Sequence, residues 1–443
     1  MQPHADVPTL SLALVLVGKR AHWNSLGAVA GALEADQRFD SLALEFARPG
    51  APALAALRRC LGRYAHVVAG YSVMTADLLW LQAEIANLRA LREAEGWGGL
   101  TLVAGGSHAT AAWRSTLALG FDHCLVGDAE RAFPEFLFQL ALGDPAPAVR
   151  GLASRRADGS LAWQGRAQSV ALDAFPPFAP RFGHHGPIEI TRGCRHRCRF
   201  CATPFLAGNR LRHRPLEAVV RAVESCLAHG VDQIRFVAPD GLAYGSEDGR
   251  PRLDRLEELL RVTSSLAGRD CTFLGSFPSE VRPEALTPRA VELIARYCGN
   301  DNLVIGAQSG SERMLQRMAR GHTVADVLRA VEITQGAGLR ANVDLILGLP
   351  GEIGEDRRQT LSLIETLAGR GARIHSHTFM PLPGAAWAHE PAGTVDRETE
   401  HLLGALALQG RQYGSWQKQA RQARAWTTLL ASFEAGRQWE AKS

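Results

Sequence analysis

The sequence predicts an α/β protein of two domains, on three observations. At 443 residues the chain exceeds the roughly 250 to 300 residues beyond which a single hydrophobic core usually stops growing. Short apolar runs alternate with helical patterns in both halves, which is typical of parallel sheets with crossover helices. The hydrophobic share of 46% and the charged share of 21% are those of a globular protein, which excludes a largely disordered chain.

In the first half, five apolar runs predict the strands of an open, doubly wound, Rossmann-like domain over residues 1–142. The runs are Leu10–Val17, Ser41–Phe46, His66–Ser72, Leu100–Gly106 and Phe121–Gly127. The intervening segments Ser25–Ala35 and Thr75–Leu91 lack proline and carry apolar residues at helical spacing, so they suit crossover helices. Prolines accumulate between residues 143 and 186, which predicts a linker or covering loop there.

In the second half, six strand-like runs predict a partial (β/α)6 barrel over residues 187–385. The runs are Ile188–Thr191, Gln233–Val237, Thr272–Phe277, Leu303–Ala307, Asn342–Leu347 and Arg373–Phe379. Apolar stripes at helical spacing between them, such as Leu216, Val219 and Val223, predict helices that pack on the strands. Residues 386–443 are expected to form a helical extension.

The net charge and the first residues of the sequence bear on the partners and the location of the protein. A net charge of +4 neither requires nor excludes a nucleic-acid partner. The segment Met1–Val17 lacks the basic flank and cleavage site of a secretory signal, and no apolar run reaches the roughly 18 to 20 residues that span a bilayer. We therefore expect a cytoplasmic protein without a membrane span, in which eight cysteines indicate thiol or metal chemistry.

Three cysteines follow the first expected barrel strand in the segment Thr191–Cys201. Cys194, Cys198 and Cys201 stand at spacings of four and three residues. Three thiolates on one loop can ligate three irons of a [4Fe-4S] cluster and leave the fourth iron open. A structural zinc site is the alternative, with a histidine as fourth ligand. The candidates for that ligand are His184, His185, His196 and His213.

The CxxxCxxC spacing, with Phe200 before the last cysteine, resembles the signature of the radical S-adenosylmethionine (SAM) superfamily. The resemblance implies that Cys194, Cys198 and Cys201 are metal ligands and catalytic residues. It also implies that the open iron chelates the amino and carboxylate groups of SAM. One electron then cleaves the sulfonium to methionine and a 5'-deoxyadenosyl radical, chemistry that the cofactors carry out and the protein orients.

The resemblance extends over roughly Ile188–Pro383, where further motifs follow the expected strands. In α/β barrels the loops at the carboxyl ends of the strands build the active site. The implied SAM-binding residues are Phe200, Asp240, Glu280, Arg282, Gln308 and Gly348. Gly348 would let the backbone approach the adenine. The family's usual Gly-Gly-Glu is replaced by Pro239, Asp240 and Gly241. Asp240 therefore either binds the SAM ammonium or caps a turn.

Small residues follow three strands of the first domain, in the segments Tyr71–Thr75, Val103–His108 and Val126–Glu130. This pattern is similar to a cobalamin-binding domain, and its pairing with a downstream radical barrel resembles cobalamin-dependent radical SAM proteins. The resemblance implies that Ser72, Gly105 and Gly106 bind cobalamin.

The motif that supplies the lower cobalt ligand in many cobalamin proteins is not intact, and Arg20, His22 and Ser25 occupy that region. His22 is either a ligand or a loop histidine. The alternatives are that cobalamin binds without a protein ligand, or that the domain has lost cofactor binding.

The leading functional prediction is a carbon methyltransferase that acts on a small molecule or peptide and takes electrons from a donor such as flavodoxin or ferredoxin. Related architectures imply cyclisation or rearrangement as alternatives.

Seven arginines lie close to the three cysteines in the sequence: Arg192, Arg195, Arg197, Arg199, Arg210, Arg212 and Arg214. These arginines could contact phosphates, and Gln308–Ser311 resembles tRNA methylthiotransferases. That resemblance implies a second iron-sulfur cluster in the first domain, where only Cys60 and Cys124 are available as ligands. We therefore do not expect a nucleic-acid partner. A zinc-stabilised interaction module is the non-enzymatic alternative.

Overall fold

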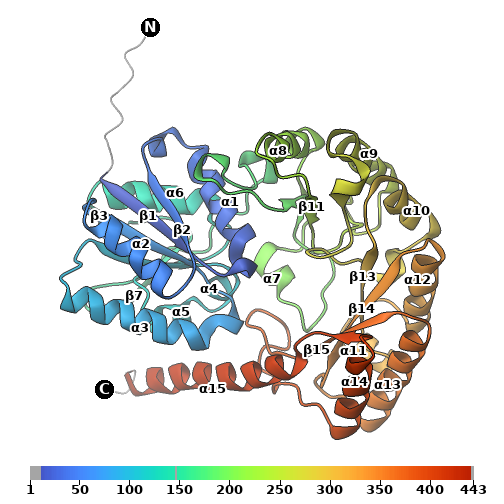
Figure 1. The fold of residues 1–443 in the computed structure, drawn as a ribbon. Helices are drawn as coiled ribbons and strands as arrows, with labels where there is room; N and C mark the ends of the chain where they lie inside the picture. The colour runs from blue at the N-terminus through green and yellow to red at the C-terminus, as the bar shows by residue number, and fades with distance from the viewer. Residues whose placement is uncertain (1–10, 145–146, 441–443) are drawn as a thin grey trace. The chain divides into compact units, whose positions relative to one another are not determined.

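A computed structural model describes residues 11–144 and 147–440, with side chains described as far as residue 433. The chain divides into two compact units, residues 1–186 with 430–443 and residues 187–429. Figure 1 shows the helices and strands of both units. Within the described residues, no helix has both the length and the apolar character that crossing a membrane requires.

The first unit is built on a seven-stranded sheet in the order β2-β1-β3-β4-β5-β6-β7. The first five strands are parallel: β1 (Leu12–Val17), β2 (Ala43–Ala47), β3 (His66–Ser72), β4 (Leu100–Gly105) and β5 (His123–Leu125). All six residues of β1 are buried, as expected for a central strand covered on both faces. The order 2-1-3-4-5 confirms the doubly wound prediction, and its switch point lies between β1 and β3.

Six helices accompany this sheet: α1 (Trp23–Glu34), α2 (Ala51–Leu61), α3 (Leu78–Ala94), α4 (Ser107–Ala111), α5 (Trp113–Ala118) and α6 (Ala129–Ala141). The core between α1, α6 and the sheet contains Leu14, Leu33, Phe133 and Phe136.

Residues 143–186 differ from the expected linker, because part of them completes the first sheet. The strands β6 (Leu152–Arg155) and β7 (Leu161–Trp163) form a hairpin that pairs antiparallel with β5. Pairing β6 with β5 satisfies backbone groups that an edge strand would leave open. Short strands among prolines carry too few residues for a periodic signal, so the sequence pattern did not reveal them.

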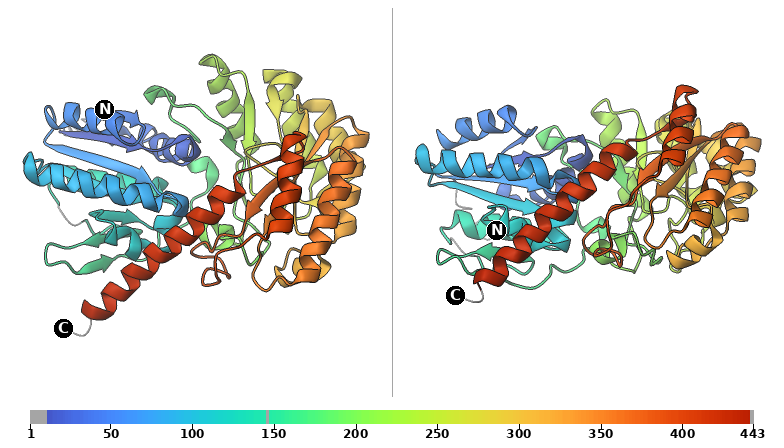
Figure 2. Two further views of the ribbon diagram at one scale, coloured as in Figure 1. Left: turned by 60° about the horizontal axis from the view of Figure 1, so that its bottom comes forward. Right: turned by 90° about the horizontal axis from the view of Figure 1, so that it is seen from below.

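The second unit has the predicted partial-barrel architecture, with its helices outside its strands (Figure 2). Its strands are β8 (Ile188–Glu189), β11 (Ile234–Val237), β12 (Thr272–Phe273), β13 (Asn302–Gln308), β14 (Arg340–Leu347) and β15 (Arg373–Thr378). They form parallel sheets in the orders β12-β11-β8 and β13-β14-β15, and the second sheet continues to β16 (Gln412–Tyr413); a bridge between Val281 and Ile305 links the two sheets.

The helices of the second unit follow its strands: α7 (Thr203–Ala207), α8 (Leu216–Ala228), α9 (Leu253–Ala267), α10 (Pro288–Tyr297), α11 (Glu312–Arg317), α12 (Val324–Gly336) and α13 (Gly354–Gly369). In β14, Ala341, Val343 and Leu345 are fully buried on one face. The alternate residues Asn342 and Asp344 therefore lie on the opposite, inner face of the barrel.

Residues 386–443 contain more than the expected helical extension. Between α14 (Arg397–Leu408) and α15 (Trp416–Glu440), the two-residue strand β16 (Gln412–Tyr413) pairs in parallel with β15. The barrel sheet thus continues past residue 385, which adds Tyr413 beside the residues of β15.

Candidate functional site

The cysteine loop of the second unit begins at a short antiparallel ladder, formed by β9 (Thr191–Arg192) and β10 (Arg212–His213). Gly193 has φ +94°, and a Cβ there would lie 2.2 Å from the carbonyl oxygen of Arg210. Only glycine fits this position. The Cys194 N–H donates to the Gly208 carbonyl at 3.1 Å, which anchors the loop across its own base.

The loop is also held to the rest of the second unit. The Arg199 N–H donates to the Met318 carbonyl at 3.0 Å, and the Arg199 carbonyl accepts from the Trp387 N–H at 2.9 Å. Phe200 packs against the apolar cluster that contains Met318 and Trp387. Phe200 therefore anchors the loop, and its predicted contact with SAM stays a prediction.

All three cysteines of the loop are free thiols, of which Cys198 is buried while Cys194 and Cys201 are partly buried. Burial raises the pKa of Cys194 to about 11, and it also raises the pKa of Cys201. Isolated thiolates are therefore disfavoured here, and a metal centre that binds thiolates would reverse that preference.

The sulfurs do not stand in the arrangement of a preformed mononuclear zinc site. Among the described residues, the group whose donor atoms all lie within 4.8 Å of one another is Asp344, His375 and His377, and the cysteines form no such group. Tetrahedral zinc with Zn–S bonds of about 2.3 Å needs sulfur atoms about 3.8 Å apart. A four-iron cluster binds each sulfur at a different iron and suits a wider spacing.

Two of the four histidines proposed as a fourth zinc ligand, His213 and His184, make contacts elsewhere. His213 contacts the Thr191 hydroxyl at 3.0 Å and the Ser246 carbonyl at 2.7 Å through its two ring nitrogens. His184 belongs to the first unit, where it stacks on Trp23. These contacts further weaken the zinc alternative.

Two buried arginines point toward the cysteine loop. Nη1 of Arg282 lies 3.9 Å and Nη1 of Arg320 lies 3.7 Å from Sγ of Cys198. Nε of Arg282 also donates to Glu284 at 2.6 Å. Two guanidinium groups at this distance stabilise negative charge on the sulfur. Arg282 was predicted from the sequence, whereas Arg320 was missed because it follows a short helix and not a strand.

Three polar side chains converge around Gly306 in the middle of this region. A Cβ on Gly306 would lie 2.5 Å from Nη2 of Arg320, 2.9 Å from Nε2 of Gln308 and 3.4 Å from Oε1 of Glu280. Gln308 itself has φ +71°, an uncommon conformation for a residue with a side chain. Burial raises the pKa of Glu280, while Arg320 and Arg282 oppose this rise. The structure thus brings together the predicted Glu280, Arg282 and Gln308.

Asp240 lies beside this group, and only one of its two carboxylate oxygens is satisfied. Oδ1 accepts a hydrogen bond from the Leu242 N–H at 3.1 Å. This bond is the turn cap that the sequence offered as the alternative role of Asp240. Oδ2 is buried without a hydrogen-bond partner in the described structure. Burial raises the pKa of Asp240 to about 6. A buried acceptor of this kind fits a ligand that donates a hydrogen bond, such as the ammonium of SAM.

Gly348 does not present open space to a ligand. A Cβ there would lie 2.5 Å from the carbonyl oxygen and 2.6 Å from the nitrogen of Thr394. Packing within the chain accounts for this glycine, and the predicted approach of the Gly348–Gly351 backbone to adenine stays a prediction.

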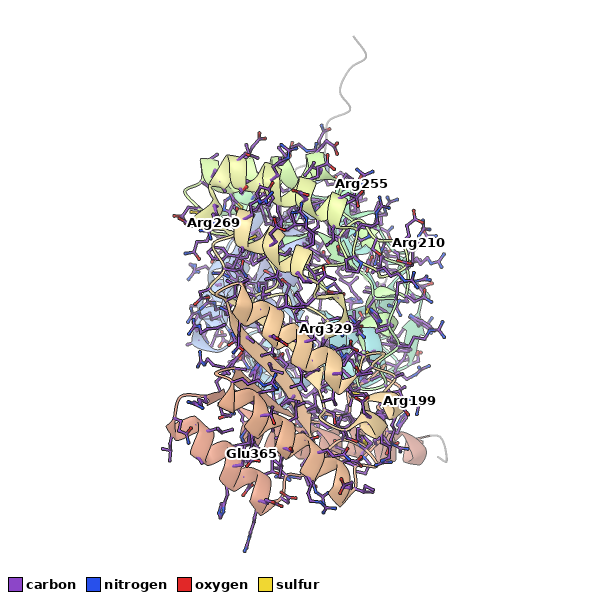
Figure 3. The ribbon with its side chains drawn as sticks, turned by 90° about the vertical axis from the view of Figure 1, so that its right-hand side faces the viewer. Arg199, Arg210, Arg255, Arg269, Arg329 and Glu365 are labelled. Atoms are coloured by element: carbon purple, nitrogen blue, oxygen red, sulfur yellow. The ribbon has the colours of Figure 1, made fainter. Side chains whose placement is uncertain are left out.

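The arginines near the cysteine loop divide into two groups. Arg192 pairs with Glu189 at 2.6 Å, and Nε of the buried Arg214 donates to the Glu189 carbonyl at 3.0 Å. Arg199 and Arg210 lie at the surface of the second unit (Figure 3). Only some of the arginines that lie close together in the sequence near the cysteines are therefore exposed at the surface.

The switch point of the first unit carries a buried ion-pair cluster that the sequence pattern did not reveal. Nε2 of His22 lies 2.7 Å from Oδ2 of Asp77, and Nδ1 of His22 accepts from the Lys19 N–H at 3.0 Å. Oδ1 of Asp77 accepts from Trp80 at 2.7 Å. Burial alone would raise the pKa of Asp77, but the bonds from His22 and Trp80 lower it to about 2.

Both ring nitrogens of His22 are thus used within the chain. His22 does not fit the role of a cobalt ligand, because no lone pair remains for a metal.

Ser72, Gly105 and Gly106 lie at the carboxyl ends of β3 and β4, as predicted, but their surroundings differ. A Cβ on Gly105 would meet only the Leu125 Cβ at 4.0 Å, so the surface beside Gly105 is open. Gly106 has φ +96° and lies against the backbone of Val73. The Ser72 hydroxyl contacts the Ser25 hydroxyl at 2.8 Å. The open surface at Gly105 would let a nucleotide tail approach the backbone closely. Ser72 and Gly106 instead contact other residues of the first unit.

Comparison with known proteins adds sequence and fold relationships. Residues 188–364 match the Radical SAM superfamily. An uncharacterized protein, MK0932, of Methanopyrus kandleri is 26% identical over 334 residues, which cover 64% of this chain and 61% of the relative. The tRNA-2-methylthio-N(6)-dimethylallyladenosine synthase of Chlorobium phaeobacteroides is 31% identical over 256 residues, which cover 57% of this chain and 55% of the relative. The chain thus spans little more than half the length of these relatives.

Solved structures share the two-domain fold at low identity. The radical SAM methyltransferase TsrM of Kitasatospora setae, solved with cobalamin and a [4Fe-4S] cluster, matches with a TM-score of 0.63 and 16% identity over 86% of this chain and 77% of that chain. The cobalamin-dependent SAM radical enzyme OxsB, with aqua-cobalamin bound, matches with a TM-score of 0.62 and 15% identity over 81% of this chain and 52% of that chain.

Proposed function

Because residues 188–364 form a radical SAM domain, we propose that this chain is a cobalamin-dependent radical SAM enzyme that methylates a carbon atom of a small molecule or peptide. The observation that carries the radical part is the cysteine loop, which places three free thiols within the matched segment and directs two buried guanidinium groups at Cys198. When bound, the cluster and SAM would supply the 5'-deoxyadenosyl radical, and cobalamin would supply the methyl group.

The residues of the chain would bind and orient these groups. Cys194, Cys198 and Cys201 would hold the cluster. Asp240 would accept a hydrogen bond from the SAM ammonium through its free oxygen, because a buried carboxylate oxygen without a donor is costly. Glu280 and Gln308 would contact SAM beside the bare backbone of Gly306.

The cobalamin part of the proposal is supported by the fold shared with TsrM and OxsB and by the open surface at Gly105. Since His22 is fully engaged, cobalamin would bind without a lower ligand from His22.

A tRNA methylthiotransferase is less well supported despite the curated relatives of that name. A second cluster in the first unit needs three cysteine ligands, and the unit offers Cys60 on α2 and Cys124 on β5. Both are buried in the core of the first unit. Cyclisation and rearrangement remain alternatives to methylation, because both reactions would also begin with the 5'-deoxyadenosyl radical.

The test is anaerobic reconstitution with iron and sulfide, followed by incubation with SAM and a reductant. We expect about four irons per chain and formation of 5'-deoxyadenosine and methionine. Cys198→Ala should abolish both, whereas Cys271→Ala, which removes a partly buried cysteine outside the loop, should retain both. Cobalt in the purified protein tests the cobalamin part separately. Formation of 5'-deoxyadenosine in a cobalt-free protein that does not bind added cobalamin would retain the radical assignment and refute the methyltransferase.

A further inference from the structure

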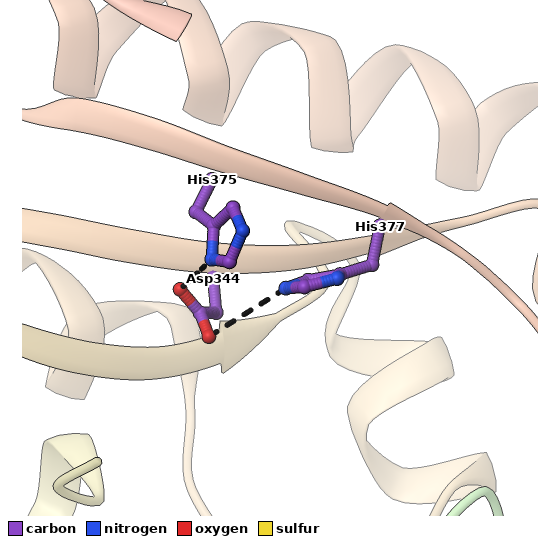
Figure 4. Close-up of side chains that lie close together, drawn as sticks. All are labelled: Asp344, His375 and His377. Atoms are coloured by element: carbon purple, nitrogen blue, oxygen red, sulfur yellow. Dashed lines mark hydrogen bonds and ion pairs between the residues drawn. The ribbon is translucent and has the colours of Figure 1, made fainter. Parts of the chain in front are cut away.

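Two adjacent barrel strands present a carboxylate and two imidazoles on one face, from residues outside the cysteine loop. Asp344 on β14 is the register partner of His375 on β15, and His377 follows two residues later. Because side chains alternate along a strand, His375 and His377 point to the same side as Asp344 (Figure 4). The backbone register therefore enforces this grouping.

The donor atoms of the three side chains have the spacing of metal ligands. Nδ1 of His375 lies 3.0 Å from Oδ1 of Asp344, and Nε2 of His377 lies 3.7 Å from Oδ2 of Asp344. All three donor atoms lie within 4.8 Å of one another. Ligand atoms bound at about 2.0–2.2 Å around zinc or iron are separated by roughly 3 to 3.6 Å, so small side-chain rotations suffice.

Neighbouring residues hold both imidazole rings in place. The ring of His375 stacks on Tyr413 with centroids 4.3 Å apart and an interplanar angle of 1°. Nδ1 of His377 lies 3.1 Å from Nε2 of Gln419, whose Oε1 accepts from the Thr378 N–H at 3.0 Å. Ordered rings lose little conformational freedom when they bind a ligand.

The charge of the cluster is unbalanced. Asp344 is largely buried, and within the described part of the chain its ion-pair contacts are with His375 and His377 and not with lysine or arginine. Glu280 is a second carboxylate close enough to interact with Asp344 electrostatically. The two histidine side chains are 26% and 28% exposed, so a small ion can reach them.

We propose that Asp344, His375 and His377 bind a divalent transition metal ion such as Zn²⁺ or Fe²⁺. Two imidazoles and one carboxylate are a ligand set that such ions favour, and three protein ligands leave coordination positions open on the inner face of the barrel. The ion would be separate from the cluster held by the cysteines. Its open positions would suit an oxygen or nitrogen atom of a polar substrate.

Gln419 provides a test that distinguishes a metal site from a simple hydrogen-bond network. Its amide orientation is fixed by the Thr378 N–H, so Nε2 donates to Nδ1 of His377, and a neutral His377 carries its proton on Nε2. A metal at Nε2 would move the proton to Nδ1, which then needs an acceptor. Gln419→Glu supplies this acceptor and should bind the metal about 10-fold more tightly.

The experiment measures zinc binding to the full-length protein with its cluster reconstituted, by equilibrium dialysis and separate determination of zinc and iron. We expect one saturable zinc in addition to the cluster iron. His375→Gln and Asp344→Asn should weaken binding at least about 100-fold, and His389→Ala, at an exposed histidine, should leave it unchanged. Melting curves followed by circular dichroism verify that each variant is folded.

Cobalt provides a second measurement in the full-length variant that lacks Cys194, Cys198 and Cys201. Bound Co²⁺ should give visible ligand-field bands that disappear in the His375→Gln background. Absence of saturable binding, or binding that survives both His375→Gln and Asp344→Asn, would overturn the proposal. Because neither measurement uses SAM or a substrate, failure here and failure of the proposed radical activity are independent.

Discussion

Nη1 of Arg320 lies 3.7 Å from Sγ of Cys198, a residue 122 positions earlier in the chain. Arg320 is buried, and its Nη2 also donates to the Gly306 carbonyl at 2.7 Å. A buried guanidinium at this position offsets negative charge on the cysteine sulfur, and that charge would increase when a cluster bound there is reduced.

Replacing Arg320 should therefore make a bound cluster harder to reduce. For Arg320→Met we expect a reduction potential more negative by on the order of 50 mV, equivalent to about 1 kcal/mol for one electron. A redox titration followed by electron paramagnetic resonance measures this shift. Arg255→Met, at an exposed arginine paired with Glu258, is the matched control and should leave the potential unchanged. Equal potentials for Arg320→Met and the wild type would show that Arg320 does not act on the cluster.

Asp240→Asn should stabilise the protein while it weakens SAM binding. The folded pKa of Asp240 is raised by burial from 3.8 to about 6, so ionisation opposes folding, and this cost is complete above about pH 6. We expect the cluster-free variant to be more stable than the wild type by about 1–3 kcal/mol at pH 7. The difference should disappear as the pH falls from about 6 to about 4, because both states then bind the proton. Urea unfolding at several pH values measures it.

The same substitution should reduce the affinity of the reconstituted protein for SAM by about 10-fold, since a charge-assisted hydrogen bond contributes about 1.5–3 kcal/mol. Wild-type affinity should increase as the pH rises through about 6, whereas that of Asp240→Asn should not. A stabilised variant with unchanged SAM affinity would place the ammonium elsewhere.

The cysteine loop offers a matched pair of glycines. Gly193→Ala introduces a Cβ 2.2 Å from the Arg210 carbonyl oxygen, and Gly208→Ala, at a similar φ of +86°, meets nothing within 4 Å. Both variants carry a conformational cost of about 1 kcal/mol, but only Gly193→Ala must displace backbone. We expect Gly193→Ala to lose most of its iron after reconstitution and Gly208→Ala to retain it. Similar iron contents in the two variants would mean that the loop adjusts freely.

The ion-pair cluster of the first unit should stabilise the protein and should not ligate cobalt. The pKa of Asp77 is lowered to about 2, so its contribution is present above about pH 4 and is lost as the pH falls through about 2. Asp77→Asn should cost about 2 kcal/mol at pH 7, measured by denaturant unfolding.

If cobalamin binds, His22→Gln should leave the resonance spectrum of its cob(II) state unchanged. Loss of a nitrogen hyperfine splitting in that variant would identify His22 as a ligand.

Local patterns predicted the fold well, because each strand of a covered parallel sheet is itself an apolar run. The runs at residues 66–72 and 373–379 coincide with β3 and β15 almost residue for residue. The strands β6, β7 and β16 were missed for a physical reason. They contain two to four residues. β6 and β16 pair with β5 and β15, which are distant in the sequence, and β7 pairs only with β6.

The sequence by itself determined the three-cysteine loop, the two-domain order and most of the polar residues at the strand ends, because these depend on spacing within short segments. Only the tertiary structure decided that Arg320 reaches Cys198, that Asp240 keeps a free oxygen, that Asp77 engages His22, and that Asp344 meets His375 and His377. The three pairings among these relationships join positions tens of residues apart, and they exist because strand register and burial bring the side chains together after the chain has folded.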